Sequence, residues 1–179
     1  TQHPILLDEL LDDRGNAAED LPALAASLAA QLDAAAGDTE RQLDILREAH
    51  HAQMFRLLAL DLAGELSVER LADHLSALAD LIVCEVVRRA WRTIASRHVE
   101  VPRFAVIAYG KLGGKELGYV SDLDVIFLFD DDDDMAAFNY AKLAQRFITW
   151  MTTHTPAGIL FDIDTALRPD GASGMLVSS

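Results

Sequence analysis

Two short apolar segments that flank a glycine-rich turn constrain the fold of this chain more than any other feature of the sequence. Residues 104–108 and 125–129 are rich in aromatic and β-branched side chains, which is typical of buried strands. The turn between them ends in Asp122 and Asp124. Because successive side chains of a strand point to opposite faces, residues two positions apart share a face, and we expect the two carboxylates to project together.

This pair of carboxylates predicts a site for a divalent cation. Carboxylates held side by side repel each other and lose solvation unless a cation or a proton neutralises them. Mg2+ prefers oxygen ligands and commonly binds one or two carboxylates together with substrate phosphates. Gly113 and Gly114, flanked by Gly110 and Gly118, let backbone N–H groups approach a phosphate closely. A metal beside a phosphate cradle indicates phosphoryl or nucleotidyl transfer.

The context and the spacing of this motif argue against other interpretations of it. An isolated Asp-x-Asp is more often a surface or capping pair than a metal site. Here it follows a Gly-Gly turn after one strand and opens a second strand, which favours the metal site. The turn does not have the dinucleotide-binding pattern Gly-x-Gly-x-x-Gly at the start of a helix. Nor is it a Walker loop, since no Gly-Lys-Ser/Thr follows.

The acidic composition argues against a nucleic-acid partner. The 179 residues include 15 basic and 29 acidic side chains, which gives a formal net charge of −14. Nucleic-acid binding depends on basic side chains that contact phosphates, and the sequence has no face rich in Lys and Arg. The apolar fraction of 51% is enough for a packed core, and the length allows one domain or a small helical region followed by one domain.

Cys84 is the only cysteine of the sequence, so neither a disulfide framework nor a cysteine zinc site can form. Its apolar helical setting predicts a place in the core. The best candidate for a membrane span is interrupted by Asp80 and Glu85 and falls short of the roughly 18 apolar residues that are needed. Since there is no signal peptide either, we expect a cytoplasmic protein without a membrane partner.

The first hundred residues predict a helical bundle. Residues 21–35 are rich in alanine and leucine, and Gly37 is expected to end this helix. Thr39 and Gln42 have the spacing of a capping box at the start of a second helix, which Gly64 closes.

Ser67 is expected to cap a third, longer helix. Its apolar positions recur at helical spacing: Leu71, Leu75, Leu78, Ile82 and Val86. Met54 and Trp91 are predicted to lie in the core. Four histidines are scattered over these helices without cysteine partners or a His-Glu-x-x-His pattern, so we expect polar positions and not metal ligands at His50, His51, His74 and His98.

A run of aspartates at residues 130–134 follows the second predicted strand, and we expect a solvated loop there and not a second metal site. Residues 135–153 then predict a helix. Arg146 of this helix could reach a phosphate, although exposure to solvent is the simpler expectation. Its inward-facing side chains are predicted to be Phe138, Leu143, Phe147, Ile148 and Met151.

A third strand is predicted at residues 159–164, after Pro156 and Gly158 break the helix. Asp162 and Asp164 share a face of this strand, so only one of them needs to reach the site.

A Gly-Gly turn followed by Asp-x-Asp on a strand resembles the nucleotidyltransferase superfamily that includes DNA polymerase beta. The longer segment YGKLGGKELGYVSDLDVIFL, residues 109–128, resembles the bacterial glutamine synthetase adenylyltransferase/adenylyl-removing enzyme family. The resemblance runs from His3 to the end of the chain. That family carries two such domains. The Tyr-Gly-Lys at Tyr109 and the Glu-Leu-Gly-Tyr at Glu116 are similar to the C-terminal, adenylylating copy, whereas the N-terminal, removing copy more usually has Met-Gly-Lys and Glu-Leu-Asn.

The resemblance implies an α+β fold. It places an N-terminal helical bundle at residues 1–100 and a small mixed-sheet nucleotidyltransferase core, of the DNA polymerase beta type, at residues 101–179. It also implies that the chain is a fragment, and that a further helical portion normally follows its C-terminal side.

The resemblance further implies the roles of individual residues. Asp122, Asp124 and Asp164 would be the catalytic residues and the ligands of Mg2+ or Mn2+, with ATP as the substrate. Asp164 matches an essential carboxylate of the family, and Asp162 falls where an acidic residue is merely common. At Ala166 this chain departs from the family, which often has an arginine there. The nucleotide-binding residues would be Gly110, Lys111, Gly113, Gly114, Ser121 and Arg168.

The implied reaction is transfer of AMP from ATP to a tyrosine hydroxyl of glutamine synthetase by a two-metal-ion mechanism, which regulates nitrogen assimilation. The PII signalling protein would regulate the full-length enzyme. Two alternatives stay open. One is the adenylyl-removing half of the same enzyme, which uses phosphate to release ADP. The other is a helical docking module whose nucleotide site does not turn over.

Overall fold

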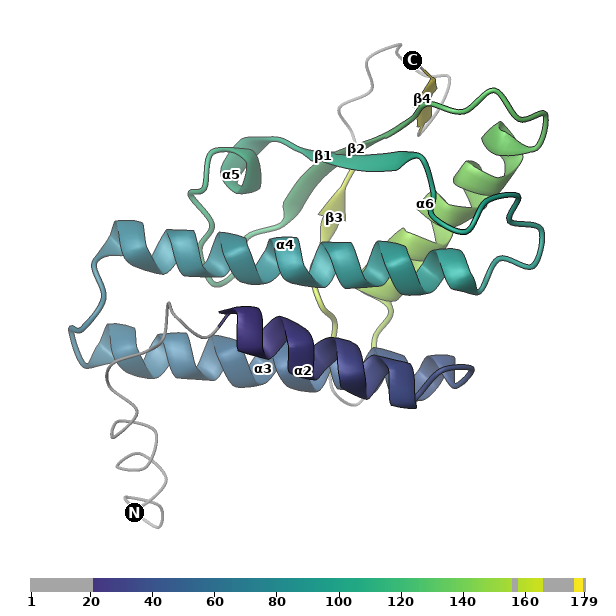
Figure 1. The fold of residues 1–179 in the computed structure, drawn as a ribbon. Coiled ribbons are helices and arrows are strands. Elements are labelled where there is room, and N and C mark those ends of the chain that lie inside the picture. Colours follow the sequence, from purple (N-terminus) through teal and green to yellow (C-terminus); the bar gives the residue numbers. More distant parts are fainter. Residues whose placement is uncertain (1–20, 156–157, 166–175, 179) are drawn as a thin grey trace.

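The structure is a computed structural model that describes residues 21–155, 158–165 and 176–178 (Figure 1). Its elements, in chain order, are α2 (Leu21–Ala34), α3 (Thr39–Leu62), α4 (Val68–Arg92), β1 (Phe104–Ala108), α5 (Gly110–Gly113), β2 (Leu123–Phe129), α6 (Ala136–Thr152), β3 (Ile163–Asp164) and β4 (Leu176–Ser178).

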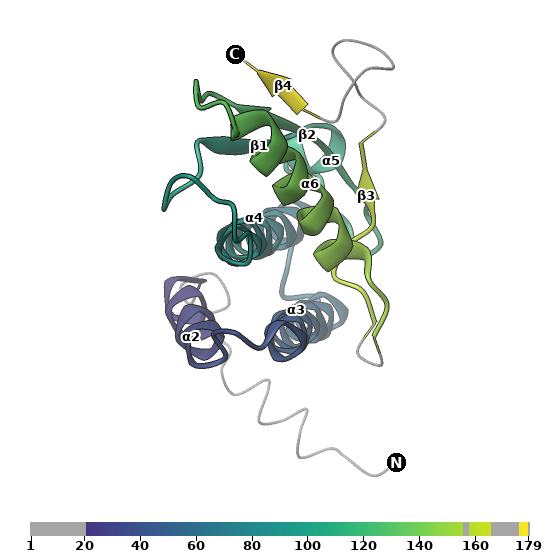
Figure 2. The same cartoon turned by 90° about the vertical axis from the view of Figure 1, so that its right-hand side faces the viewer.

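The long helix α4 lies between the pair formed by α2 and α3 and the sheet (Figures 1 and 2). Its predicted apolar face is confirmed, because Leu75, Leu78, Ile82 and Val86 are buried, and Leu71 packs against them in part. The buried cluster is continuous from the helices to the sheet, since it also contains side chains of α2, α3, β2 and α6.

Cys84 is exposed, so the prediction that it packs in the core is wrong. It follows the buried Ile82 by two residues, which places it about 200° around the helix, on the opposite face. Trp91 is buried as predicted and stacks on Tyr140 of α6, and Met54 packs against the core in part.

Most predictions of the residues that cap or end the helices are confirmed, and one is wrong. Ser67 caps α4 by accepting a hydrogen bond from the N–H of Arg70, and Gly37 and Gly64 adopt positive φ just after α2 and α3. The capping box at Thr39 is absent, because Asp38 is the N-cap of α3 and accepts from the N–H of Arg41 at 3.0 Å.

The side chain of Gln42 has a different role from the predicted one. It is buried and donates to the backbone oxygen of Ala35 at 3.1 Å, just beyond the end of α2. The same carbonyl oxygen also accepts from the N–H of Asp38 at 3.1 Å, so Gln42 adds a second donor to the turn that joins α2 to α3.

The sheet is mixed, as predicted. β1 pairs antiparallel with β2, in a register that runs from Phe104↔Phe129 to Ala108↔Val125. β3 and β4 pair parallel with β2 along its other edge. The mixed α+β class is thus confirmed, and the closer likeness to DNA polymerase beta stays a prediction, as does the division into two domains.

The strand β3 is shorter than predicted, since it contains only residues 163 and 164. The N–H groups of Leu160 and Phe161 donate to the backbone oxygen of Met151 in the last turn of α6. Residues 160 and 161 are therefore held by the end of a helix, and contact with β2 begins only at Asp162, whose backbone oxygen accepts from the N–H of Leu123.

Two further predictions on the second half of the chain are corrected. Phe138 is 51% exposed, because the core face of α6 is formed by Ala136, Tyr140 and Leu143 and leaves residue 138 on the opposite side. Asp131 of the aspartate run is not solvated, since its carboxylate lies against His98 and the hydroxyl group of Tyr140. The hydrogen bond with His98, and to a smaller extent that with Tyr140, lowers the pKa of Asp131 to about 2.

Within the part of the chain that the structure describes, none of the helices combines the length and the apolarity that a bilayer span requires.

Candidate metal centre

Three carboxylates meet where β2 begins beside β3. Asp122 directly precedes β2, and the parallel register places Asp124 opposite Asp164. Oxygen atoms of the three side chains lie within 4.8 Å of one another. The structure therefore brings together the three acidic residues that the sequence analysis singled out. Asp162, which is exposed, is not a member of this group.

The backbone around the carboxylates is fixed by hydrogen bonds from both neighbouring segments. The N–H of Tyr109, at the end of β1, donates to the backbone oxygen of Asp124 at 2.9 Å. The N–H of Leu123 donates to the backbone oxygen of Asp162, also at 2.9 Å. Because these bonds tie β2 to β1 and to the chain that leads into β3, the carboxylates approach each other through the sheet and not through a mobile loop.

Gly110 leaves room for the Asp124 carboxylate. It has a φ of +50°, which favours glycine. A Cβ atom at this position would overlap the carboxylate of Asp124. The glycine thus contributes to the carboxylate cluster, by allowing α5 to lie against Asp124.

The segment predicted as a glycine-rich turn begins with one turn of helix, α5. The N–H groups of Gly113 and Gly114 donate to the oxygens of Tyr109 and Gly110, both at 2.9 Å. A Cβ atom on Gly113 would lie 2.6 Å from the Ala108 oxygen, so this glycine lets α5 pack on the end of β1. The amides of Gly113 and Gly114 therefore already have partners within this turn.

The other residues predicted to bind the nucleotide lie in different surroundings. Lys111 is exposed. The hydroxyl oxygen of Ser121 accepts a hydrogen bond from the N–H of Gly118 at 2.9 Å and so closes the turn just before Asp122. Arg168 and Ala166 lie outside the described residues.

The donor set fits a hard divalent cation. In an octahedral Mg2+ site with oxygen ligands at 2.0–2.1 Å, neighbouring ligands are about 3 Å apart and opposite ligands about 4 Å apart. A spread of 4.8 Å for three carboxylate oxygens is close to these separations, so small rotations of the side chains would complete a site. Carboxylate oxygens without cysteine or histidine are the ligands that Mg2+ and Mn2+ take in proteins.

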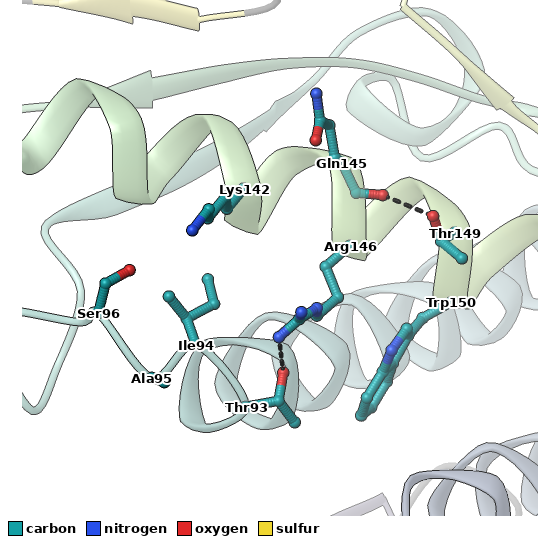
Figure 3. Close-up of a pocket in the computed structure, with 9 residues that line it drawn as sticks. All are labelled: Thr93, Ile94, Ala95, Ser96, Lys142, Gln145, Arg146, Thr149 and Trp150. Carbon is teal, nitrogen blue, oxygen red and sulfur yellow. Dashed lines mark hydrogen bonds between the residues drawn. The ribbon is translucent and has the colours of Figure 1, made fainter.

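A cavity of about 570 Å3 lies elsewhere, between the end of α4 and α6 (Figure 3). None of the three carboxylates lines it. Lys142 and Arg146 point toward it in Figure 3, and Arg146 donates a hydrogen bond to the hydroxyl group of Thr93. Arg146 is thus half-buried and paired with α4, in contrast to the expected exposure to solvent, and the cavity does not belong to the metal centre.

One contact of the segment between α5 and β2 could not be predicted from the sequence. The hydroxyl group of Tyr119 donates to the carboxylate of Asp61, in the last turn of α3, at 3.1 Å. Desolvation, followed by this hydrogen bond, raises the pKa of Tyr119 to about 12, so the hydroxyl group stays protonated and can donate. The two residues are far apart in the sequence, and although Tyr119 ends the Glu-Leu-Gly-Tyr motif, nothing in that motif indicates Asp61 as its partner.

Comparison with known proteins gives one consistent result. The model of the glutamate-ammonia ligase adenylyltransferase family matches residues 1–179. The chain is 60% identical over 180 residues to a protein of Chromobacterium violaceum, with 100% of the chain and 20% of the relative covered. It is 59% identical to a protein of Aromatoleum aromaticum, with 100% and 19% covered, and 54% identical to one of Ralstonia nicotianae, with 99% and 19% covered.

Each of these relatives is described as a bifunctional glutamine synthetase adenylyltransferase/adenylyl-removing enzyme. The chain spans about one fifth of their length.

Proposed function

The chain belongs to the glutamate-ammonia ligase adenylyltransferase family, and from this premise we propose that it is the nucleotidyl-transferring part of a longer enzyme that attaches AMP from ATP to a tyrosine hydroxyl of glutamine synthetase. One observation carries the proposal. Asp122, Asp124 and Asp164 converge to within 4.8 Å from two adjacent strands, beside a helical turn that begins at Gly110.

The carboxylates have distinct tasks in the proposed reaction. Asp122 and Asp124 would hold one divalent ion, Mg2+ or Mn2+, and Asp164 would help to hold a second. When bound, such ions neutralise phosphate charge and lower the pKa of an attacking hydroxyl group. The tyrosine oxygen forms a bond to the α-phosphorus while the bond from that phosphorus to the bridging oxygen breaks. Pyrophosphate leaves with the bonding electrons, and the hydroxyl proton passes to solvent.

The triphosphate would lie along α5. Since the amides of Gly113 and Gly114 donate within the helical turn, we assign these glycines chiefly to the close packing of α5 on β1. Gly110 and Lys111, at the start of α5, would face the phosphates, with the exposed Lys111 ammonium and Arg168 as cations and with Ser121 shaping the loop. We also propose, by the same family relation, that the PII signalling protein regulates the longer enzyme.

The proposed attachment is tested in a full-length enzyme that carries this chain. Radiolabelled ATP and unmodified glutamine synthetase form one mixture, and labelled adenylylated synthetase with phosphate forms another. We expect label on the synthetase in the first mixture, and we expect Asp122→Ala to abolish this transfer while release of ADP in the second mixture persists.

The opposite pattern, in which Asp122→Ala abolishes only the release of ADP, would assign this chain to the adenylyl-removing half. If Asp122→Ala left both reactions unchanged, the chain would be a docking module and the proposal would be wrong.

A further inference from the structure

Helix α3 contacts both segments that carry the carboxylates. Arg47 of α3 is fully buried, and its Nη2 donates to the backbone oxygen of Thr153 at 2.7 Å. Thr153 is the C-cap of α6, at the start of the connection that leads to Asp164. Through this bond a cation of the helical region is placed at the end of α6, where the helix dipole favours positive charge.

The same face of α3 continues along the connection. The ring of His50 packs on the ring of Phe161, with 4.6 Å between their centroids. The ring of His51 lies close to Gly158, where an added Cβ atom would be 3.5 Å from it. Arg47, His50 and His51 therefore contact the described ends of the connection between α6 and β3.

The other end of α3 contacts the segment that carries Asp122 and Asp124. Asp61 accepts the hydrogen bond from the hydroxyl group of Tyr119 at 3.1 Å. Tyr119 precedes Asp122 by three residues, in the turn that the Ser121 side chain closes. One rigid helix thus holds both parts of the chain whose separation decides how far apart the carboxylates lie.

The buried guanidinium of Arg47 is only partly hydrogen-bonded. Among the residues that the structure describes, Nε and Nη1 of Arg47 have no hydrogen-bond partner. Burial of a cation that is only partly paired is costly, and apolar side chains of similar volume are often equal or better in such positions. Desolvation accordingly lowers the pKa of Arg47. Within the described part of the chain, two of the three guanidinium nitrogens thus add no hydrogen bond to the fold, while the third holds the connection to β3, which favours a role of Arg47 in positioning.

We propose that α3 sets the separation of the carboxylates in the metal centre. Arg47 is the positioning residue for Asp164. The contact between Asp61 and Tyr119 positions Asp122 and Asp124. This inference rests on the proposed metal centre. It also means that a partner or a neighbouring domain that shifts α3 changes the metal affinity without contacting the carboxylates.

The test uses the 179-residue chain and four variants. Arg47→Met removes the donor to Thr153 and keeps an unbranched side chain, and Arg47→Lys keeps one donor. Arg41→Met is the matched control, because Arg41 is an exposed arginine on the same helix that pairs with Glu48. Tyr119→Phe removes only the hydroxyl group that contacts Asp61.

The first measurement is hydrogen exchange without metal. Arg47→Met should speed exchange of the amides of Leu160, Phe161 and Leu123 about fivefold, as loss of one anchoring hydrogen bond implies. The amide of Tyr109 should be unchanged. Tyr119→Phe should leave the Leu160 and Phe161 amides protected, because it acts on the other segment.

The second measurement is Mn2+ affinity, from the electron paramagnetic resonance signal of free Mn2+. Arg47→Met and Tyr119→Phe should each weaken binding about tenfold, as loss of groups that orient metal ligands typically does. Arg47→Lys should restore part of the affinity, and Arg41→Met should match the unchanged chain.

The possible failures have different meanings. Faster exchange with unchanged Mn2+ affinity would overturn the inference and leave the metal centre intact. A uniform rise of exchange at all amides would show a general structural role for Arg47 and would also overturn it. Failure of the unchanged chain to bind Mn2+ would refute the metal centre itself, and with it the inference.

Discussion

The position of Asp124 depends on the absence of a side chain at Gly110. The carboxylate occupies the space that a Cβ atom on residue 110 would need, and the backbone there has a positive φ. The glycine-rich sequence around Gly110 predicts a phosphate cradle. The structure gives this glycine a further task, which depends on a contact between the two ends of the loop and therefore has no local signal.

Substitution of this glycine tests that task. Gly110→Ala should lower the free energy of unfolding by roughly 1–3 kcal/mol, since a non-glycine residue is strained at this φ, and should weaken Mn2+ binding by displacing Asp124. Gly118→Ala is the control, because a Cβ atom there would meet only the Ser121 hydroxyl oxygen, at an ordinary 3.7 Å. Urea unfolding and Mn2+ titration measure the two effects. Equal effects of the two substitutions would contradict this role of Gly110.

At the scale of elements, local patterns identified β1 to the residue and most of α4 and α6, because strand composition and helical periodicity are properties of a single segment. They failed where contacts with a second segment determine the limits of an element or the partner of a side chain. β3 is short because the amides of residues 160 and 161 bind the end of α6. Gln42 does not cap its own helix but donates to the carbonyl group of Ala35, just beyond the end of α2. Only the fold reveals such partners.

The corrected start of α3 gives a prediction on stability. Asp38→Ala should lower the free energy of unfolding by about 1 kcal/mol, since the carboxylate of Asp38 is the N-cap that accepts from the N–H of Arg41. Thr39→Ala should change it by less than about 0.5 kcal/mol, because alanine is a good helix former at a position inside α3. Urea denaturation of both variants decides between them. A larger loss with Thr39→Ala would restore the capping box that the sequence suggested.

At the scale of the whole molecule, the helices and the sheet share one buried cluster, and α3 contacts both segments of the candidate metal centre. The acidic triad was predictable in part: Asp-x-Asp after a glycine turn and two acidic residues on a third strand are visible in the sequence, whereas the choice of Asp164 over Asp162 came from the family resemblance. The contacts that hold the segments carrying the triad were not predictable. Arg47 and Tyr119 act through contacts with residues 106 and 58 positions away, respectively.

The most direct test of the central claim, that Asp122, Asp124 and Asp164 form one metal and nucleotide centre, is a thermal shift with Mn2+ and a non-hydrolysable ATP analogue. At one hundred times its dissociation constant a ligand adds about 2.7 kcal/mol, or roughly 5–10 °C for a chain of this length. Asp124→Asn should abolish this shift and leave the metal-free melting temperature equal or higher, because it removes one of three clustered like charges. Asp162→Asn, outside the cluster, should keep the full shift. No shift in the unchanged chain, or an undiminished shift in Asp124→Asn, would contradict the claim.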